Sequence, residues 1–161
     1  MAYTDIDKPS DYFETVTYAG GTTDISSLDF QPDFVWGKKR TGAENHALFD
    51  SVRGATKTLN SNTTAAESTR SGSLTSFDGD GFTMGGSDGI ISSSGNKYVA
   101  WNWKAGGTAS SNTDGSITSS VSANTDAGFS IVSYTGTGSN ATVGHGLGVA
   151  PKVLILKSRT R

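Results

Sequence analysis

The carboxylates best placed for chemistry lie in a glycine-rich hexapeptide, FDGDGF. Asp78 and Asp80 form a D-x-D-G pattern that also occurs in calcium-binding loops, and Asp88 follows a few residues later. A complete EF-hand loop further needs an oxygen ligand at position 5 and a bidentate Glu at position 12. Counted from Asp78, those positions hold Phe82 and Gly89. The pattern therefore favours a hairpin turn, with a weak calcium site at Asp78, Asp80 and Asp88 as the alternative.

Other catalytic patterns are scarce. His46 and His145 are the only histidines, and His145 stands in GHGLG without the Cys, His or carboxylate neighbours that a metal site requires. A loop-shaping role suits it better. The chain has no G-x-S-x-G elbow, and its acidic residues lie mostly in turns rather than in paired positions. We therefore expect no enzyme and, apart from the weak calcium alternative, no cofactor.

The three tryptophans allow two interpretations, an aromatic platform for sugar rings or a hydrophobic core. Val99, Trp101 and Trp103 share one face of an alternating run, which favours the core for Trp101. Trp103 stands at the end of the run, where burial and glycan contact are both open. Asn102 points to the other face. We take Trp103 and Asn102 as the candidate glycan contacts.

Composition narrows the class of protein. Of the 161 residues nearly half are Ser, Thr, Gly or Asn, the hydrophobic fraction is 34%, and the formal net charge is −2. A nucleic-acid binder would need a basic surface, so no nucleic-acid partner is expected. No apolar run is long enough to span a membrane, and no cysteine is present for disulfides. Three Trp, five Tyr and seven Phe in periodic runs argue against disorder.

The first residues, MAYTDIDKPSD, contain neither a basic segment nor an apolar segment of a signal peptide. A composition typical of surface proteins without an export signal fits virion proteins, which are made in the host cytoplasm and released by lysis. The expected localisation is therefore the virion.

Alternating apolar runs separated by turn residues predict short strands along most of the chain. The expected strands are residues 15–18, 33–38, 47–52, 74–77, 82–84, 97–105, 116–122, 129–134 and 153–157. Residues 57–59 suit a short strand or a turn, and residues 63–69 could form at most one helical turn. Many short strands with almost no helix imply a sandwich or barrel. We expect an all-β fold, an antiparallel β-sandwich of lectin-like or jelly-roll-like type.

The chain also begins to repeat itself. YFETVTYAGG at residues 12–21 matches GFSIVSYTGTG at 128–138, and FQPDFVWGKKR at 30–40 matches GVAPKVLILKSR at 148–159. The expected organisation is an N-terminal arm (1–11), a first β-module (12–107), a linker (108–115) and the beginning of a second, truncated β-module (116–161).

The repeat carries two expectations. Residues 13–18 with 33–40, and 129–134 with 152–159, should form the same pair of strands in two modules. The apolar run at 153–157 should be a strand buried on both faces. If its partner strands are missing, we expect residues 153–156 to pair with their own module's hairpin or with a neighbouring subunit, and a homotrimer is our first expectation.

Several segments together resemble a known module. They are LDFQPDFVWGKKR, LFDSVRGATKTLNSNTTAAE, SLTSFDGDGFTMGG, NKYVAWNWKAGG and GFSIVSYTGTGSNATVGHGLGVAPKVLILKSR. From about residue 7 onward the chain is similar to a β-rich module of phage tail-fibre and receptor-binding structural proteins of marine and cyanobacterial phages. FDSVRG and VAWNWKAGG are the most specific pieces. The resemblance implies a virion component, often beside concanavalin-like lectin modules, and assigns no binding residue.

The sequence therefore predicts a structural and adhesive component of a phage virion, a tail-fibre or appendage module that attaches to the host surface. Its expected partners are further copies of itself, other virion proteins and a host-surface glycan, without membrane insertion. A cellular surface adhesin or carbohydrate-binding module is the alternative, and a capsid-decorating protein is a second one.

Overall fold

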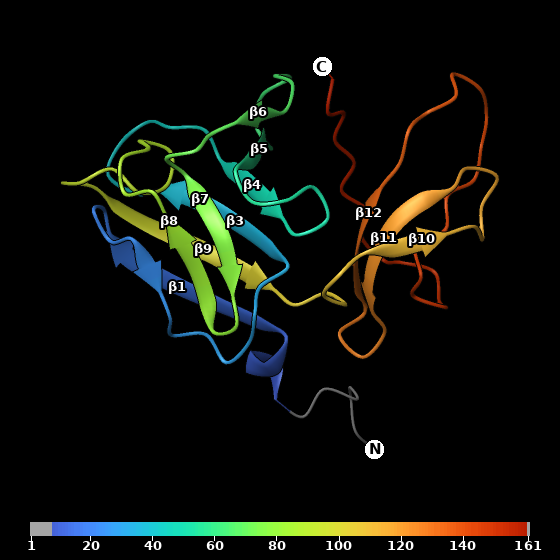
Figure 1. The fold of residues 1–161 in the computed structure, drawn as a ribbon, viewed down its shortest axis with the longest axis horizontal. Helices are drawn as coiled ribbons and strands as arrows, with labels where there is room; N and C mark the ends of the chain where they lie inside the picture. The colour runs from blue at the N-terminus through green and yellow to red at the C-terminus, as the bar shows by residue number, and fades with distance from the viewer. Residues whose placement is uncertain (1–7, 161) are drawn as a thin grey trace.

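The computed structural model describes residues 8–160, and within them every regular element except one short 3-10 turn is a β-strand. Figure 1 shows these strands gathered in two units along the chain. The larger sheet of the first unit is antiparallel, with strand order β1-β9-β3-β4-β5-β6. Its strands are β1 (Phe13–Ala19), β3 (Phe34–Lys39), β4 (Ala47–Asp50), β5 (Lys57–Asn60), β6 (Ser68–Thr69) and β9 (Lys97–Trp103).

A smaller antiparallel sheet covers one face of the larger one. Its order is β2-β8-β7, formed by β2 (Asp24–Ile25), β7 (Leu74–Asp78) and β8 (Gly81–Met84). Figure 1 shows β7 and β8 crossing in front of β9 and β3. The buried residues between the sheets form one cluster: Ile25, Val35, Ala47, Phe49, Leu74, Phe82, Met84, Ile90, Ile91 and Ala100. The predicted all-β antiparallel sandwich is therefore confirmed.

The hairpin predicted at FDGDGF is also confirmed. β7 and β8 pair up to Asp78 and Gly81, which leaves Gly79 and Asp80 as the turn. Glycine is required at position 81 by the approach of β2, because a β-carbon there would lie 1.6 Å from the Ile25 carbonyl oxygen. The turn residues therefore serve the packing of the smaller sheet.

The central strand β9 alternates as predicted but with the opposite face inward. Tyr98, Ala100 and Asn102 are each 0% exposed, whereas Trp101 is only partly buried. Our assignment of Trp101 to the core is therefore wrong. The inner face of β9 lies against the smaller sheet, where Ala100 joins the core cluster, while the bulky indoles occupy the outer face.

The FDSVRG segment forms a turn around a buried arginine. The Arg53 side chain is 5% exposed and donates from Nε to Asp50 and from Nη1 to Glu67 at 3.0 Å. Its remaining donors reach the carbonyl oxygens of Leu48 at 3.0 Å and Lys57 at 3.2 Å. Because two carboxylates and two carbonyls satisfy it, this one guanidinium links β4, β5 and the segment that leads into β6.

Residues 63–69 do not form the helical turn that we considered for them. Ser68–Thr69 is the edge strand β6, which pairs antiparallel with β5. The residues immediately before it are irregular. Pairing with β5 stabilises this segment more than helix formation would, because a seven-residue segment without an apolar stripe does not form a stable helix.

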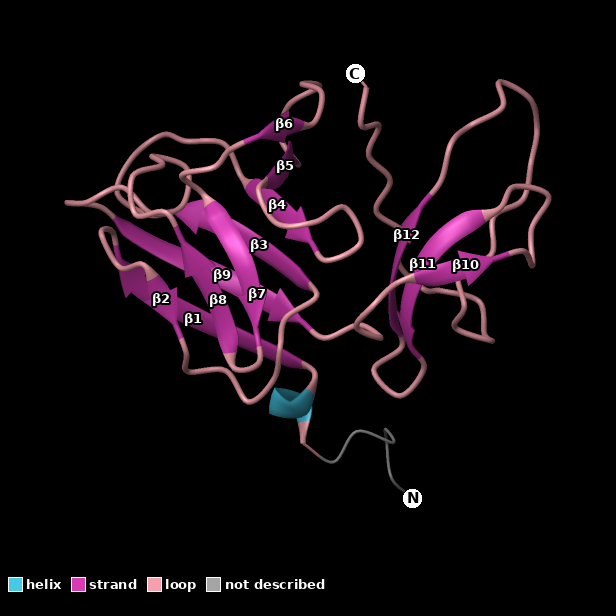
Figure 2. Cartoon of the chain, in the orientation of Figure 1, coloured by secondary structure: helices cyan, strands magenta, loops and turns pink. Residues whose placement is uncertain are grey.

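The second unit has its own antiparallel sheet, with the order β10-β11-β12 (Figure 2). Its strands are β10 (Ser110–Asn112), β11 (Ser119–Asn124) and β12 (Phe129–Ser133). Part of the predicted linker 108–115 is therefore strand β10, which pairs with β11. The expected arm 1–11 falls outside the described residues up to residue 7, and Pro9–Asp11 forms the 3-10 turn η1.

The repeat is only half reproduced in the structure. Both predicted strands at its start exist, as β1 and β12. Residues 153–157 form no strand, and Leu154 is 79% exposed, so the predicted doubly buried strand is wrong. β1 and β3 also do not pair with each other, because β9 lies between them.

Candidate functional site

Partly exposed aromatic side chains lie on the outer face of the six-stranded sheet, the face opposite the smaller sheet. One row across the strands is formed by Thr15, Trp101 and Trp36, which are direct neighbours in the register of β1, β9 and β3. Strand alternation places these side chains away from the core. We call Thr15, Thr17, Trp36, Lys38, Val99 and Trp101 the outer aromatic face.

The two indoles of this face contact each other and are held in place by a histidine. Trp36 and Trp101 pack edge to face, with ring centroids 6.4 Å apart and an interplanar angle of 78°. Trp36 Nε1 donates a hydrogen bond of 3.0 Å to Nδ1 of His46. Burial, with a smaller contribution from the Lys38 ammonium, lowers the pKa of His46, which favours the neutral ring whose Nδ1 accepts this bond. The Trp36 ring is therefore positioned before any ligand arrives.

Polar groups border the indoles. The next row of the register contains Thr17, Val99 and Lys38, of which Thr17 is exposed and the other two are partly exposed. Two hydroxyls from β1 and one ammonium from β3 thus lie beside an apolar centre. A flat apolar surface with donors and acceptors at its rim can stack on the C–H face of a sugar ring and hydrogen-bond its hydroxyls.

Trp103, one of the two glycan candidates from the sequence, lies where the two units meet. Its ring packs against Phe13 at 4.8 Å, Phe34 at 5.4 Å and Phe129 at 6.2 Å between centroids. Phe129 belongs to β12 of the second unit, so this cluster joins the two units. Trp103 is still partly exposed, but its ring also contacts aromatic rings of both units.

Asn102, the other glycan candidate, cannot reach a ligand at the surface. It is 0% exposed, and its Nδ2 donates to the Glu14 carbonyl at 3.1 Å and to the Ala100 carbonyl at 3.3 Å. Its Oδ1 has no hydrogen-bond partner among the described residues. Our assignment of Asn102 as a glycan contact is corrected accordingly: its amide braces β1 against β9 from the inner side.

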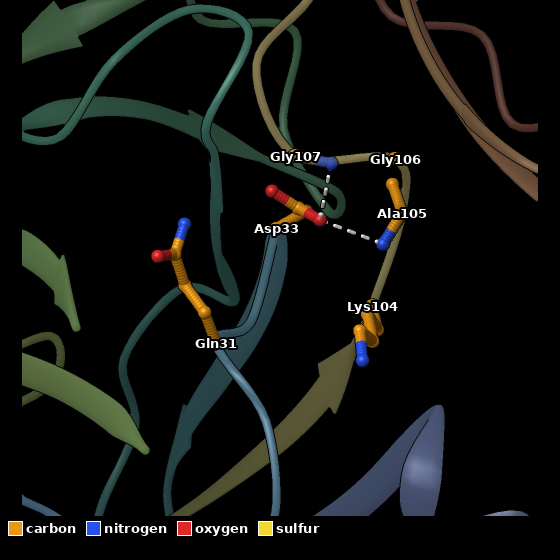
Figure 3. Close-up of a pocket in the computed structure, with 6 residues that line it drawn as sticks. All are labelled: Gln31, Asp33, Lys104, Ala105, Gly106 and Gly107. Atoms are coloured by element: carbon orange, nitrogen blue, oxygen red, sulfur yellow. Dashed lines mark hydrogen bonds between the residues drawn. The ribbon is translucent and has the colours of Figure 1, made fainter. Parts of the chain in front are cut away.

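A shallow hollow lies at the junction of the units, lined by Gln31, Asp33, Lys104, Ala105, Gly106 and Gly107 (Figure 3). The Asp33 carboxylate points at the backbone rather than at the solvent, and it is 2% exposed. Its Oδ2 accepts hydrogen bonds from the N–H groups of Ala105 at 2.8 Å and Gly107 at 3.1 Å. Its Oδ1 accepts from Ser51 Oγ at 2.9 Å. Because its oxygens are already used, Asp33 holds the junction and is not a free ligand group.

The three carboxylates of the weak calcium alternative are not brought together. Asp78 accepts from Thr83 Oγ1 at 2.8 Å, while Asp88 receives two bonds from Arg70 Nη1 at 2.8 and 2.9 Å. Within residues 8–160 no three His, Cys, Asp or Glu side chains gather as a metal-ion site would require. His145 accepts from the Leu147 N–H at 3.2 Å, as a loop-shaping residue would.

Comparison with known proteins gives one family. The sequence model described as a domain of unknown function (DUF7483) matches residues 8–161. The chain belongs to this family. No curated protein and no solved structure matches it. In the described part of this DUF7483 domain, no helix is long and apolar enough to cross a membrane.

No sequence pattern indicates the roles of two residues that shape this DUF7483 domain. His46 lies ten residues after Trp36 in a loop, and a Trp–His pair at that spacing has no recognised pattern. Asp33 looked like the first residue of a strand after proline. Its bonds to residues 105 and 107 depend on long-range strand pairing between β3 and β9, which sequence spacing does not reveal.

Proposed function

We propose that this DUF7483 domain is a structural and adhesive module of a phage virion, and that it binds host-surface carbohydrate on its outer aromatic face. The observation that carries the binding proposal is the pair of partly exposed indoles, Trp36 and Trp101, on the outer sheet face beside the hydroxyls of β1. The placement on a virion rests on the composition and on the resemblance to tail-fibre modules described above.

The aromatic pair suits carbohydrate for physical reasons. Sugar rings present C–H groups with slight positive charge, which favour the electron-rich face of an indole. Contiguous apolar groups at a surface that are bordered by polar residues often mark an interaction site. Lys38 is the charged residue of the outer aromatic face, and the two threonine hydroxyls are neutral. A neutral or weakly acidic glycan therefore fits it better than a protein partner, which would require a larger apolar area.

The proposal is tested by binding to a glycan array and to purified surface polysaccharides, with variants that separate the face from other aromatics. Trp101→Ala should weaken binding about tenfold, because it removes one stacking interaction. Trp36→Ala and His46→Ala should also weaken it, the latter less, since the histidine only positions Trp36. Tyr134→Ala is the matched control, because Tyr134 is 40% exposed and lies outside the face.

A folded Trp101→Ala variant that binds as well as the parent would contradict the proposal. Circular dichroism and denaturant unfolding of each variant distinguish lost binding from lost folding. If no glycan binds the parent protein at millimolar concentration, the adhesive part of the proposal is wrong and a spacer role remains.

A further inference from the structure

Residues 153–156 present a run of large apolar side chains to the solvent. Val153, Leu154, Ile155 and Leu156 are 78%, 79%, 63% and 70% exposed. Among the described residues, none of their backbone groups is hydrogen-bonded to another backbone group. An apolar segment whose backbone donors and acceptors are free can pair with another strand in the way an unpaired strand edge does.

Contacts after this segment anchor it next to the first unit. Lys157 Nζ donates to the Thr63 carbonyl, and the Glu67 N–H donates to the Arg159 carbonyl at 2.9 Å. Arg159 also forms a bidentate pair with Glu67, at 2.9 and 3.0 Å. Figure 1 shows the segment as the dark red trace that runs upward beside β12, on the side of β6. The segment is therefore held in one place although its apolar side chains are uncovered.

The first unit shows which strand pairs with the corresponding segment there. By the sequence repeat, β3 corresponds to residues 153–158 and β1 corresponds to β12. In the first unit β9 lies between β1 and β3 and runs antiparallel to both, so that Trp103 is the neighbour of Phe13 and of Phe34. The two repeated strands are thus built to flank a third strand and not to pair with each other.

The second unit keeps the two flanks of this arrangement. β12 is an edge strand that pairs only with β11, which leaves its other edge open. Arg159 Nη1 contacts Ser133 Oγ at 3.3 Å, so residue 159 lies next to the end of β12. Its counterpart, Arg40, donates its backbone N–H at 2.7 Å to the carbonyl of Lys97, the first residue of β9. The contact between Arg159 and Ser133 therefore marks the end at which a strand like β9 would begin.

We propose that residues 153–156 and the open edge of β12 form a docking slot for one antiparallel β-strand, supplied by a β9-type segment of a second DUF7483 unit. Such a strand has the alternating pattern of KYVAWNW, with small or polar residues on one face and aromatic residues on the other. It would satisfy the free backbone groups on both flanks and lie beside Val153–Leu156, as strand addition does at other sheet edges. No contact of the outer aromatic face is involved, so this proposal is independent of carbohydrate binding.

A peptide of residues 96–105, NKYVAWNWKA, extended by two lysines for solubility, provides the strand. Hydrogen–deuterium exchange of the full chain is measured with and without this peptide. We expect amide exchange at residues 153–156 and in β12 to slow about tenfold at saturating peptide, because strand pairing protects exposed amides. Exchange in β1 and β3 should not change, which shows that the peptide does not replace β9 in the first unit.

Two controls make the result specific. The same peptide with Ala100→Pro cannot pair through that residue and should give no protection. In the protein, Ile155→Pro should abolish the protection by the parent peptide, whereas Ile155→Thr, which remains compatible with a strand, should retain it. Equal protection by both peptides, or none by either, would overturn the proposal.

Self-association is the competing outcome. If residues 153–156 become protected without peptide as protein concentration rises, and light scattering shows a dimer or trimer, copies of this chain pair through the edge. The edge would then be paired with a folded copy, whose own β9 lies between β1 and β3, and the proposed β9-type occupant would be wrong.

Discussion

The two units of the chain share a sequence pattern but differ in what covers their strands. In the first unit a second sheet packs over the six-stranded sheet, and Val35, Phe49 and Phe82 are 0% exposed. In the described residues of the second unit, Val121 at 5% and Leu147 at 9% are the buried apolar side chains. Val35 and Leu154 hold equivalent positions of the repeat, yet Leu154 is 79% exposed.

The difference between these two positions shows that the apolar pattern alone does not make a strand here. Val35 lies in β3, between β9 and β4, and the smaller sheet covers its side chain. Residues around Leu154 have the same apolar character but no strand on either side. Burial and backbone pairing therefore come from partner strands distant in sequence, and the same segment stays irregular without them.

Truncating one core residue in each unit should give the largest difference in the free energy of unfolding between the units. Phe49→Ala should lower the free energy of unfolding by about 3 to 5 kcal/mol, through lost burial and a cavity in a closed core. Val121→Ala should cost about 1 to 2 kcal/mol, because fewer methyl groups are lost from a thin, open layer. Denaturant unfolding followed by tryptophan fluorescence reports the first unit, where all three tryptophans lie, and hydrogen–deuterium exchange of the β11 amides under the same conditions reports the second. Equal losses for the two variants would show that the second unit has a core as complete as the first.

The two arginines that contact Glu67 provide the next comparison. Arg53 is 5% exposed and Arg159 is 46% exposed, and both donate to this carboxylate. Arg53→Met should destabilise the protein by about 3 to 5 kcal/mol, because it leaves buried carboxylates without their partner. Arg159→Met should cost about 1 kcal/mol or less, as for an exposed pair. Urea unfolding measures both, and a larger effect at Arg159 would show that the contact between the units dominates stability.

Acid titration should weaken this contact through Glu67. The hydrogen bond from Arg159, and with it the bond from Arg53, holds the pKa of Glu67 below its ordinary value. A depressed carboxyl pKa contributes stability above the pKa of the unfolded chain, and this contribution disappears as pH falls through the folded-state pKa. The free energy of unfolding should therefore fall on acidification below about pH 4.5.

Glu67→Gln provides the control for this titration, because it removes the titrating group and keeps the shape of the side chain. The fall in stability between pH 6 and pH 3 should be smaller in this variant than in the parent. An identical fall in both proteins would assign the acid sensitivity to other carboxylates.

The smallest effect should come from backbone strain in the first unit. Thr56 has a φ of 68°, a left-handed conformation that is rare for a β-branched residue. Thr56→Asn should raise the free energy of unfolding by about 1 kcal/mol or less, because Asn adopts this conformation more readily. Thr69→Asn on the exposed edge strand β6 is the matched control and should not stabilise. Thermal unfolding of the two variants checks this, and a loss of stability in Thr56→Asn would show that the Thr56 side chain makes a favourable contact.

Local sequence signals predicted the elements well and their orientation poorly. The hairpin at FDGDGF followed from its turn residues, and alternation predicted the start of β9 correctly but its end two residues too late. Alternation does not show which face of a strand is buried. Because two large tryptophans lie on one face of β9, that face was predicted to be the buried one, which is wrong. The inner space of the sandwich holds Ala100 and Asn102 from β9, while Trp101 packs edge to face on Trp36 outside. The aromatic residues of the site were therefore visible in the sequence, but their exposure depended on the position of the smaller sheet.

The Asp33 carboxylate has a mechanical consequence. Because β1 and β3 run antiparallel to β9, Phe13, Phe34 and Trp103 lie at one end of the sheet, and the chain enters and leaves the first unit there. Tension between η1 and the second unit would peel the strands apart from this end, one hydrogen bond after another. The Lys104–Tyr12 backbone bond and the two bonds from Ala105 and Gly107 to Asp33 lie ahead of the first strand pairs. They must break before β1 can peel from β9, so they resist the first step of opening together with the Arg159–Glu67 pair, which also joins the two units.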